Sequence, residues 1–69
     1  MKKINVYING EKKLISISSN LSDVLKNFEI DANKIAIEIN QKVIPKSLYK
    51  NTLIKNEDKI EVVQFIGGG

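Results

Sequence analysis

The sequence predicts an α+β domain of two layers, in which a mixed sheet of four or five strands is crossed by one main helix. Short segments of alternating apolar and polar residues indicate strands, and one segment has the three- and four-residue apolar spacing of a helix. Turn residues separate these segments. Leu, Ile, Val and Phe make up about a third of the 69 residues, which is enough to bury the core of one small domain.

A hairpin is expected at the start of the chain. Alternation over residues 4–8 predicts a strand, and Asn9-Gly10 is a strong signal for a two-residue turn because both residues tolerate positive φ. The return strand is predicted over about Lys12 to Ile17, in which the orientation of Leu14 is open. The inward positions are expected at Ile4, Val6, Ile8, Ile15 and Ile17.

One helix should follow this hairpin. Asn20 is placed to cap its first turn, and Asp23, three residues later, is typical of a capping box. The apolar stripe that would pack on the sheet consists of Leu21, Val24, Leu25 and Phe28.

The second half of the sequence predicts three more strands. The first has Ile35, Ile37 and Ile39 inward, and the last has Ile60 and Val62 inward. Between and around them we expect a turn at Asn40-Gln41, a short strand Val43-Ile44 ended by Pro45, one helical turn at 47–49, a polar turn at 56–58, and a last strand from Lys59 to about Phe65.

This order of elements predicts the β-grasp, or ubiquitin-like, arrangement. The first and last strands are long and apolar, so we place them side by side at the centre of the sheet. The crossing helix makes them parallel if the usual crossover rule holds. We expect the β-grasp domain to span residues 1–66 and a flexible glycine tail to span 67–69.

Composition excludes several classes of function. The chain has no cysteine and no histidine, which removes disulfides, thiol nucleophiles and the side chain best suited to proton transfer near neutral pH. The net charge of +3 comes from scattered lysines, so no nucleic-acid partner is expected. No apolar stretch is long enough to cross a bilayer. We therefore expect a cytoplasmic protein with no membrane partner, no metal site and no catalytic residue of its own, and a monomer when free.

The sequence stops at Gly67, Gly68 and Gly69, although only one glycine precedes them. Three extended glycines reach about 10 Å and carry no Cβ atom, so they can thread a narrow channel. They would present the carboxylate of Gly69 to a second protein. Because that carboxylate is ionised at pH 7 and a poor electrophile, it would need activation by the partner. The other interpretations are a frayed end or an expression scar.

A partner surface is predicted beside this tail. Val63 and Phe65 should point to the open side of the sheet, where Tyr7 on the neighbouring strand should share their face. Exposed apolar groups that lie together can mark a binding site, although single ones are normal. Ile66 would anchor the base of the tail or belong to the edge of the core.

Three segments together resemble the ThiS family of sulfur carrier proteins. They are Ile8-Asn9-Gly10-Glu11, the run from Ile39 to Lys46 that contains Val43-Ile44-Pro45-Lys46, and the end from Ile60 to Gly69. The resemblance covers nearly the whole chain. Many members have glycine where this chain has Gln41, and Gly-Asp where it has Glu57-Asp58. These departures predict turns in which non-glycine residues adopt a left-handed conformation.

The resemblance implies a mechanism. A ThiF-type adenylating enzyme would use ATP and Mg to convert the Gly69 carboxylate to an acyl-adenylate. A persulfide donor would then supply the sulfur of a thiocarboxylate, and a ThiG-type thiazole synthase would take that sulfur into the thiazole of thiamine. The chain would be a protein co-substrate that binds no cofactor itself.

Three alternatives stay open at this point. Within the sulfur carriers, the chain could instead be a molybdopterin synthase small subunit of the MoaD type. It could be a ubiquitin-like modifier joined to lysines through Gly69. It could also be a non-covalent binding module whose glycines are incidental.

Overall fold

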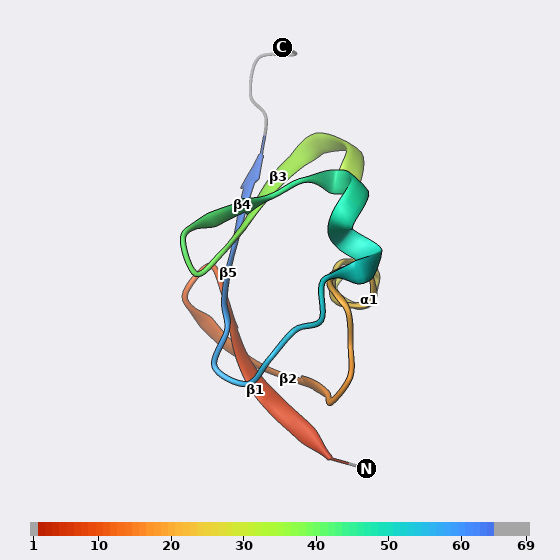
Figure 1. The fold of residues 1–69 in the computed structure, drawn as a ribbon. Helices are drawn as coiled ribbons and strands as arrows, with labels where there is room; N and C mark the ends of the chain where they lie inside the picture. The colour runs from red at the N-terminus through yellow and green to blue at the C-terminus, as the bar shows by residue number, and fades with distance from the viewer. Residues whose placement is uncertain (1, 65–69) are drawn as a thin grey trace.

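The computed structural model describes residues 2–64, in which the chain forms a five-stranded sheet, one α-helix and two 3₁₀ helices (Figure 1). In chain order the elements are β1 (Lys3–Ile8), β2 (Glu11–Ser16), α1 (Leu21–Asn27), a 3₁₀ helix (Ala32–Lys34), β3 (Ile35–Ile39), β4 (Lys42–Ile44), a second 3₁₀ helix (Lys46–Asn51) and β5 (Lys59–Gln64). Every strand expected from the sequence is present. The helical turn predicted at 47–49 belongs to the longer second 3₁₀ helix.

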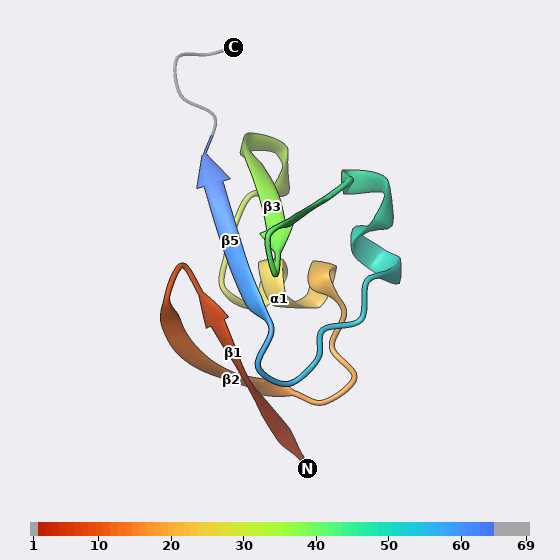
Figure 2. The same cartoon turned by 60° about the vertical axis from the view of Figure 1, so that its left-hand side comes forward.

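The sheet has the strand order β2-β1-β5-β3-β4. β1 and β5 pair parallel, with Tyr7 opposite Lys59 and Ile8 opposite Ile60, and the other neighbouring strands pair antiparallel. β5 follows the other strands in sequence but lies in the middle of the sheet, between β1 and β3 (Figure 2). This topology confirms the predicted β-grasp fold and the parallel pairing of its first and last strands.

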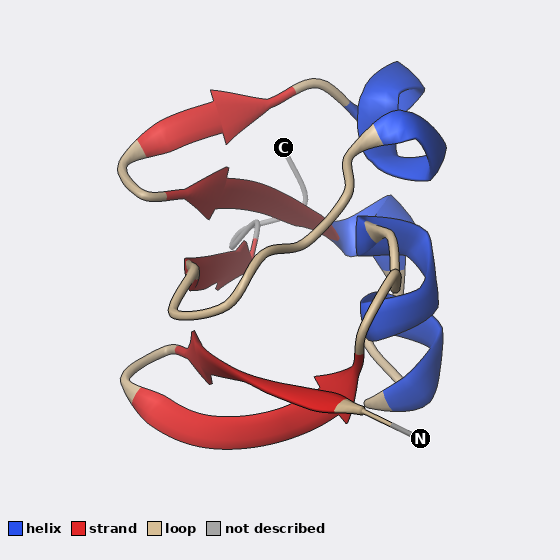
Figure 3. Cartoon of the chain, turned by 60° about the horizontal axis from the view of Figure 1, so that its bottom comes forward, coloured by secondary structure: helices blue, strands red, loops and turns tan. Residues whose placement is uncertain are grey.

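The helices gather on one side of the sheet (Figure 3). α1 and the 3₁₀ helices form this second layer, and the hydrophobic core fills the space between the two layers. None of the described elements covers the opposite side of the sheet, which we call the outer face. Side chains on the outer face are therefore open to solvent or to a partner.

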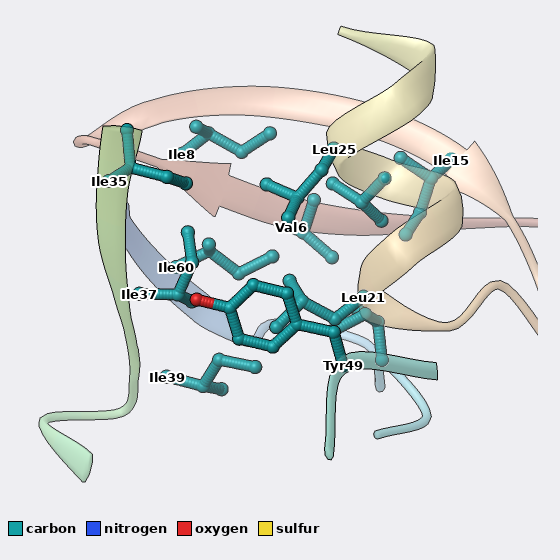
Figure 4. Close-up of a cluster of buried hydrophobic side chains, with 12 residues drawn as sticks. Val6, Ile8, Ile15, Leu21, Leu25, Ile35, Ile37, Ile39, Tyr49 and Ile60 are labelled. Atoms are coloured by element: carbon teal, nitrogen blue, oxygen red, sulfur yellow. The ribbon is translucent and has the colours of Figure 1, made fainter. Parts of the chain in front are cut away.

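Alternate residues of the strands build the core together with α1 (Figure 4). Val6, Leu21 and Ile37 are fully buried, and each such side chain stabilises the fold by about 1.5–3 kcal/mol. The complete buried set is Val6, Ile8, Ile15, Leu21, Val24, Leu25, Ile35, Ile37, Ile39, Tyr49, Ile54 and Ile60. Ile4, Phe28 and Val62 are half-buried against this cluster, so they too lie on the predicted side.

The capping box predicted for α1 is present. The Asn20 side chain accepts a hydrogen bond from the backbone N–H of Asp23 (2.7 Å), and the Asp23 carboxylate accepts one from the N–H of Asn20 (3.0 Å). A cap of this kind is worth about 1 kcal/mol. Because a helix of seven residues is too short to be stable alone, α1 also depends on packing of its apolar stripe.

Several turns use left-handed residues that are not glycine. Asn9-Gly10 connects β1 to β2 with φ values of 50° and 83°, and Asn40-Gln41 connects β3 to β4 with 52° and 70°. Glu57, in the turn before β5, has φ 70°. Gln41 and Glu57 are the two positions at which the sequence departs from the glycines common in the family that it resembles, so the prediction of left-handed non-glycine turns is confirmed.

The prediction for Ile17 is wrong. Ile17 is 52% exposed, because β2 ends at Ser16 and the chain turns at Ser18, which has φ 74°. The alternation that buries Ile15 therefore stops before it reaches Ile17. Leu14, whose orientation the sequence left open, is 62% exposed and belongs to the outer face.

Candidate functional site

The residues predicted for a partner surface lie on the outer face but are spread along it. Val63 is 48% exposed, and Tyr7 is half-buried on the same face. Tyr7 lies beside Lys59, however, while Val63 lies four residues further along β5, where Ala36 of β3 is its neighbour. Four residues of strand span about 13 Å, so these two side chains do not form one continuous patch. Phe65 and Ile66 lie outside the described residues, as do Gly67, Gly68 and Gly69.

The register brings together two acidic residues that the sequence analysis did not single out. Glu38 of β3 is directly opposite Glu61 of β5, and both side chains belong to the outer face. Val43 of β4 lies on the other side of Glu38 and is 67% exposed. The next pair toward the end of β5 is Ala36 and Val63. An acidic pair thus lies between the exposed Val43 and the pair Ala36–Val63, near the middle of the central strand.

The end of β5 is hydrogen-bonded on both sides. On the β3 side, Gln64 pairs with Ile35. On the other side β1 has already ended, and the turn residue Asn9 continues the pairing. The Asn9 side-chain Oδ1 accepts a hydrogen bond from the N–H of Val62 (2.8 Å), and the Asn9 N–H donates to the carbonyl of Ile60 (2.9 Å). β5 is therefore fixed in position as far as Val62 on one side and Gln64 on the other.

Asn40 has a corresponding role at the start of β5. Its Oδ1 accepts a hydrogen bond from the N–H of Lys59 (3.0 Å), and its Nδ2 donates to the carboxylate of Asp58 (2.9 Å). Sequence reasoning assigned Asn9 and Asn40 only to turns and missed these bonds. Their one signal in the sequence is that both turns begin with asparagine, which has a side-chain acceptor as well as tolerance of positive φ.

An open hollow of about 730 Å³ lies beside the end of β5, on the side of the sheet that carries the helices. Its apolar wall is formed by Ile8, Ile30, Ile35 and Val62, and Glu29, Asp31 and Lys34 are its charged lining residues. This combination can hold an apolar side chain.

Three further observations concern the described residues as a whole. Across residues 2–64, no three His, Cys, Asp or Glu side chains lie close enough together to hold a metal ion. Burial raises the pKa of the Tyr49 hydroxyl, but Tyr49 packs in the core, away from the outer face. In the same part of the chain, no helix has the length and apolar character needed to span a membrane.

These features define a class: a β-grasp domain whose central strand is the last described element before the glycine segment of the sequence. The family model described as the ThiS family matches residues 6–69. The crystal structure of the thiamine biosynthesis protein ThiS from Geobacter metallireducens is similar with a TM-score of 0.85 and 26% identity, over 96% of this chain and 100% of that one.

Two curated relatives agree with this match. The sulfur carrier protein ThiS of Bacillus subtilis is 31% identical over 49 residues, which are 71% of this chain and 74% of that protein. The thiazole synthase of Paramagnetospirillum magneticum is 38% identical over 66 residues. Those residues are 96% of this chain but only 20% of the synthase, so the chain spans about a fifth of that relative. The chain belongs to the ThiS family.

Proposed function

We propose that the chain is a sulfur carrier of thiamine biosynthesis whose reactive group is the C-terminal carboxylate of Gly69. The observation that carries this proposal is the family match, which extends through residue 69 and so includes the glycines. The protein acts as a co-substrate in the cytoplasm and has no catalytic activity of its own.

The fixed position of β5 supports this role. A carrier has to present a slender reactive end from a domain that a partner enzyme can grip. The central strand is held on one side as far as Val62 and on the other as far as Gln64, which supports its use as a rigid base for the segment that follows in the sequence. Glycines without side chains then pass through a channel that would exclude larger residues.

The chemistry requires other proteins. A ThiF-type enzyme, with ATP and Mg, transfers an adenylyl group to the Gly69 carboxylate and releases pyrophosphate. The terminal sulfur of a persulfide donor then attacks the activated carbonyl carbon, AMP leaves, and an acyl disulfide forms. A thiol from the partner proteins attacks the donor's sulfur in that S–S bond, forms a disulfide with the donor, and releases the Gly69 thiocarboxylate. The absence of cysteine and histidine from the sequence agrees with this division of labour, because nucleophile and base come from the partners.

A ThiG-type thiazole synthase is the proposed acceptor of the sulfur. The match of nearly the whole chain to about a fifth of a thiazole synthase supports this pairing, because one polypeptide there contains a related segment together with a much longer one. A shared polypeptide raises the effective concentration of two partners that otherwise have to meet by diffusion.

Intact mass spectrometry tests the proposal. The full chain is incubated with ATP, Mg, the adenylating enzyme and a persulfide source, and the expected product has one terminal oxygen replaced by sulfur. The matched control lacks Gly68-Gly69. Its described fold should be unchanged, because every pairing of β5 ends at Gln64.

Growth assays complete this test. The full chain should rescue a thiamine auxotroph and not a molybdenum-cofactor mutant, and the trimmed chain should rescue neither. The proposal is wrong if the trimmed chain supports growth without thiamine as well as the full chain does.

A further inference from the structure

The acidic pair on the outer face is unfavourable for the fold itself. Glu38 and Glu61 face each other across β3 and β5, and like charges directly opposite each other destabilise a sheet. Neither carboxylate has a lysine of the described residues within ion-pair distance, although the chain carries 11 lysines. Two negative charges therefore lie on adjacent strands of a protein whose net charge is positive, and within residues 2–64 neither of them forms an ion pair.

Apolar groups flank this pair on two sides. Val43 lies beside Glu38, and Ala36 and Val63 form the next pair toward the end of β5. We call these five residues the acidic-apolar patch: Ala36, Glu38, Val43, Glu61 and Val63. An apolar contact beside charged groups has the composition of a protein interface, in which the apolar part contributes affinity and the charges contribute specificity and association rate.

The position of the patch indicates its partner. The patch includes Val63, one residue before the end of β5, and β5 is the last described strand before the glycine segment in the sequence. An enzyme that takes in this segment can therefore cover the patch in the same complex. At the start of β5 the charge of the outer face is positive instead of negative. Lys59 lies there beside Tyr7, and Lys12 is the neighbour of Tyr7 on its other side. Charge complementarity therefore favours one orientation of a partner that covers the patch.

We propose that the acidic-apolar patch docks a surface of the thiazole synthase that carries arginine or lysine side chains around an apolar centre. This inference rests on the proposed function and adds the chemistry of the recognition surface. The complex relieves the repulsion between Glu38 and Glu61, so the pair costs stability in the free chain and contributes attraction in the complex.

The test uses the double variant Glu38→Gln/Glu61→Gln in the full chain. Titration calorimetry with purified thiazole synthase should give a Kd about 3- to 10-fold weaker than wild type, because each exposed charge pair contributes only modestly. The salt dependence of Kd should also decrease, and Glu61→Lys should weaken binding further. The matched control is Glu57→Gln, which removes one charge in the turn before β5, at the opposite end of that strand.

Thermal unfolding gives a second measurement. If Glu38 and Glu61 only stabilised the fold, their replacement would lower the melting temperature. The double variant should melt a few degrees higher than wild type while it binds more weakly. A lower melting temperature, binding equal to wild type, or an equal effect of Glu57→Gln would each overturn the inference. So would failure of wild type to bind the synthase, or sedimentation that shows the patch buried in a dimer of the chain.

Failure of this inference can be separated from failure of the proposed function. Thiocarboxylate formation on wild type by the adenylating enzyme is measured by intact mass in the same preparations. If wild type acquires sulfur and donates it while the double variant binds the synthase normally, the inference about the patch is wrong and the carrier function stands. If wild type acquires no sulfur, the carrier function is wrong whatever the calorimetry gives.

Discussion

Replacement of Asn9 by glycine separates the two roles of this residue. Asn9 occupies a left-handed turn position with φ 50°, and its side chain accepts the hydrogen bond from the N–H of Val62 at 2.8 Å. Glycine adopts the same φ without strain, so Asn9→Gly keeps the turn and removes only the acceptor. The Val62 N–H, which lies beyond the end of β1, then has only water as its partner.

The structure gives the size of the effect. A single hydrogen bond that water can replace contributes about 0.5–1.5 kcal/mol net. Glycine has more conformational freedom in the unfolded chain, which lowers the stability of the fold. It also has no strain at positive φ, which raises the stability, so the two effects largely cancel. We therefore expect Asn9→Gly to lower the free energy of unfolding by about 1 kcal/mol, which corresponds to a Tm decrease of about 4–8 °C for a domain of this size.

Two measurements check this reasoning. Circular dichroism gives Tm, and hydrogen exchange read by NMR should show the amide of Val62 exchanging about five times faster than in wild type. The matched control is Asn9→Asp, which tolerates positive φ and keeps a side-chain oxygen at the same place. The reasoning is refuted if Asn9→Asp loses as much stability as Asn9→Gly, or if exchange at Val62 does not change.

Two further predictions concern the turns and the core. Gln41→Gly and Glu57→Gly should each raise Tm by a few degrees, because the cost of a left-handed non-glycine residue, about 1–2 kcal/mol, exceeds the entropy cost of glycine; a lower Tm in either variant contradicts this. Burial raises the pKa of Tyr49, so the stability associated with its protonated form is complete below pH 10 and lost as the pH rises through the folded-state pKa. Tyr49→Phe should accordingly lose less stability than wild type between pH 7 and pH 11 in urea unfolding, and an equal loss in both proteins would show that Tyr49 is not responsible.

Local patterns were sufficient to predict most of this fold. Alternation at Ile35, Ile37 and Ile39 identified β3, and Asn20 with Asp23 identified the start of α1, because these signals depend only on neighbouring residues. The parallel pairing of β1 and β5 was predicted from the helix that crosses the sheet between them, and it is confirmed. Ile17 was misplaced because nothing in its alternation shows that the strand ends at Ser16, where the backbone turns.

The candidate site was less accessible to sequence reasoning, because it depends on register. The sequence shows that Tyr7 and Val63 share a face, but the distance between them follows from the pairing of Tyr7 with Lys59. The opposition of Glu38 and Glu61 likewise arises from the alignment of β3 with β5, two strands about twenty residues apart. A single sequence contains no local signal for such an alignment.

The central place of β5 has a consequence for the order of events on the ribosome. β1 and β3 are synthesised long before β5, and until β5 emerges from the exit tunnel each lacks the partner that separates them in the finished sheet. Ile8 and Ile60 are neighbours in the sheet although they lie near opposite ends of the described chain. Forming this contact costs much conformational entropy, so it is a slow step of folding. The nascent protein can therefore complete its sheet only after β5, the last strand of the described chain, has been made.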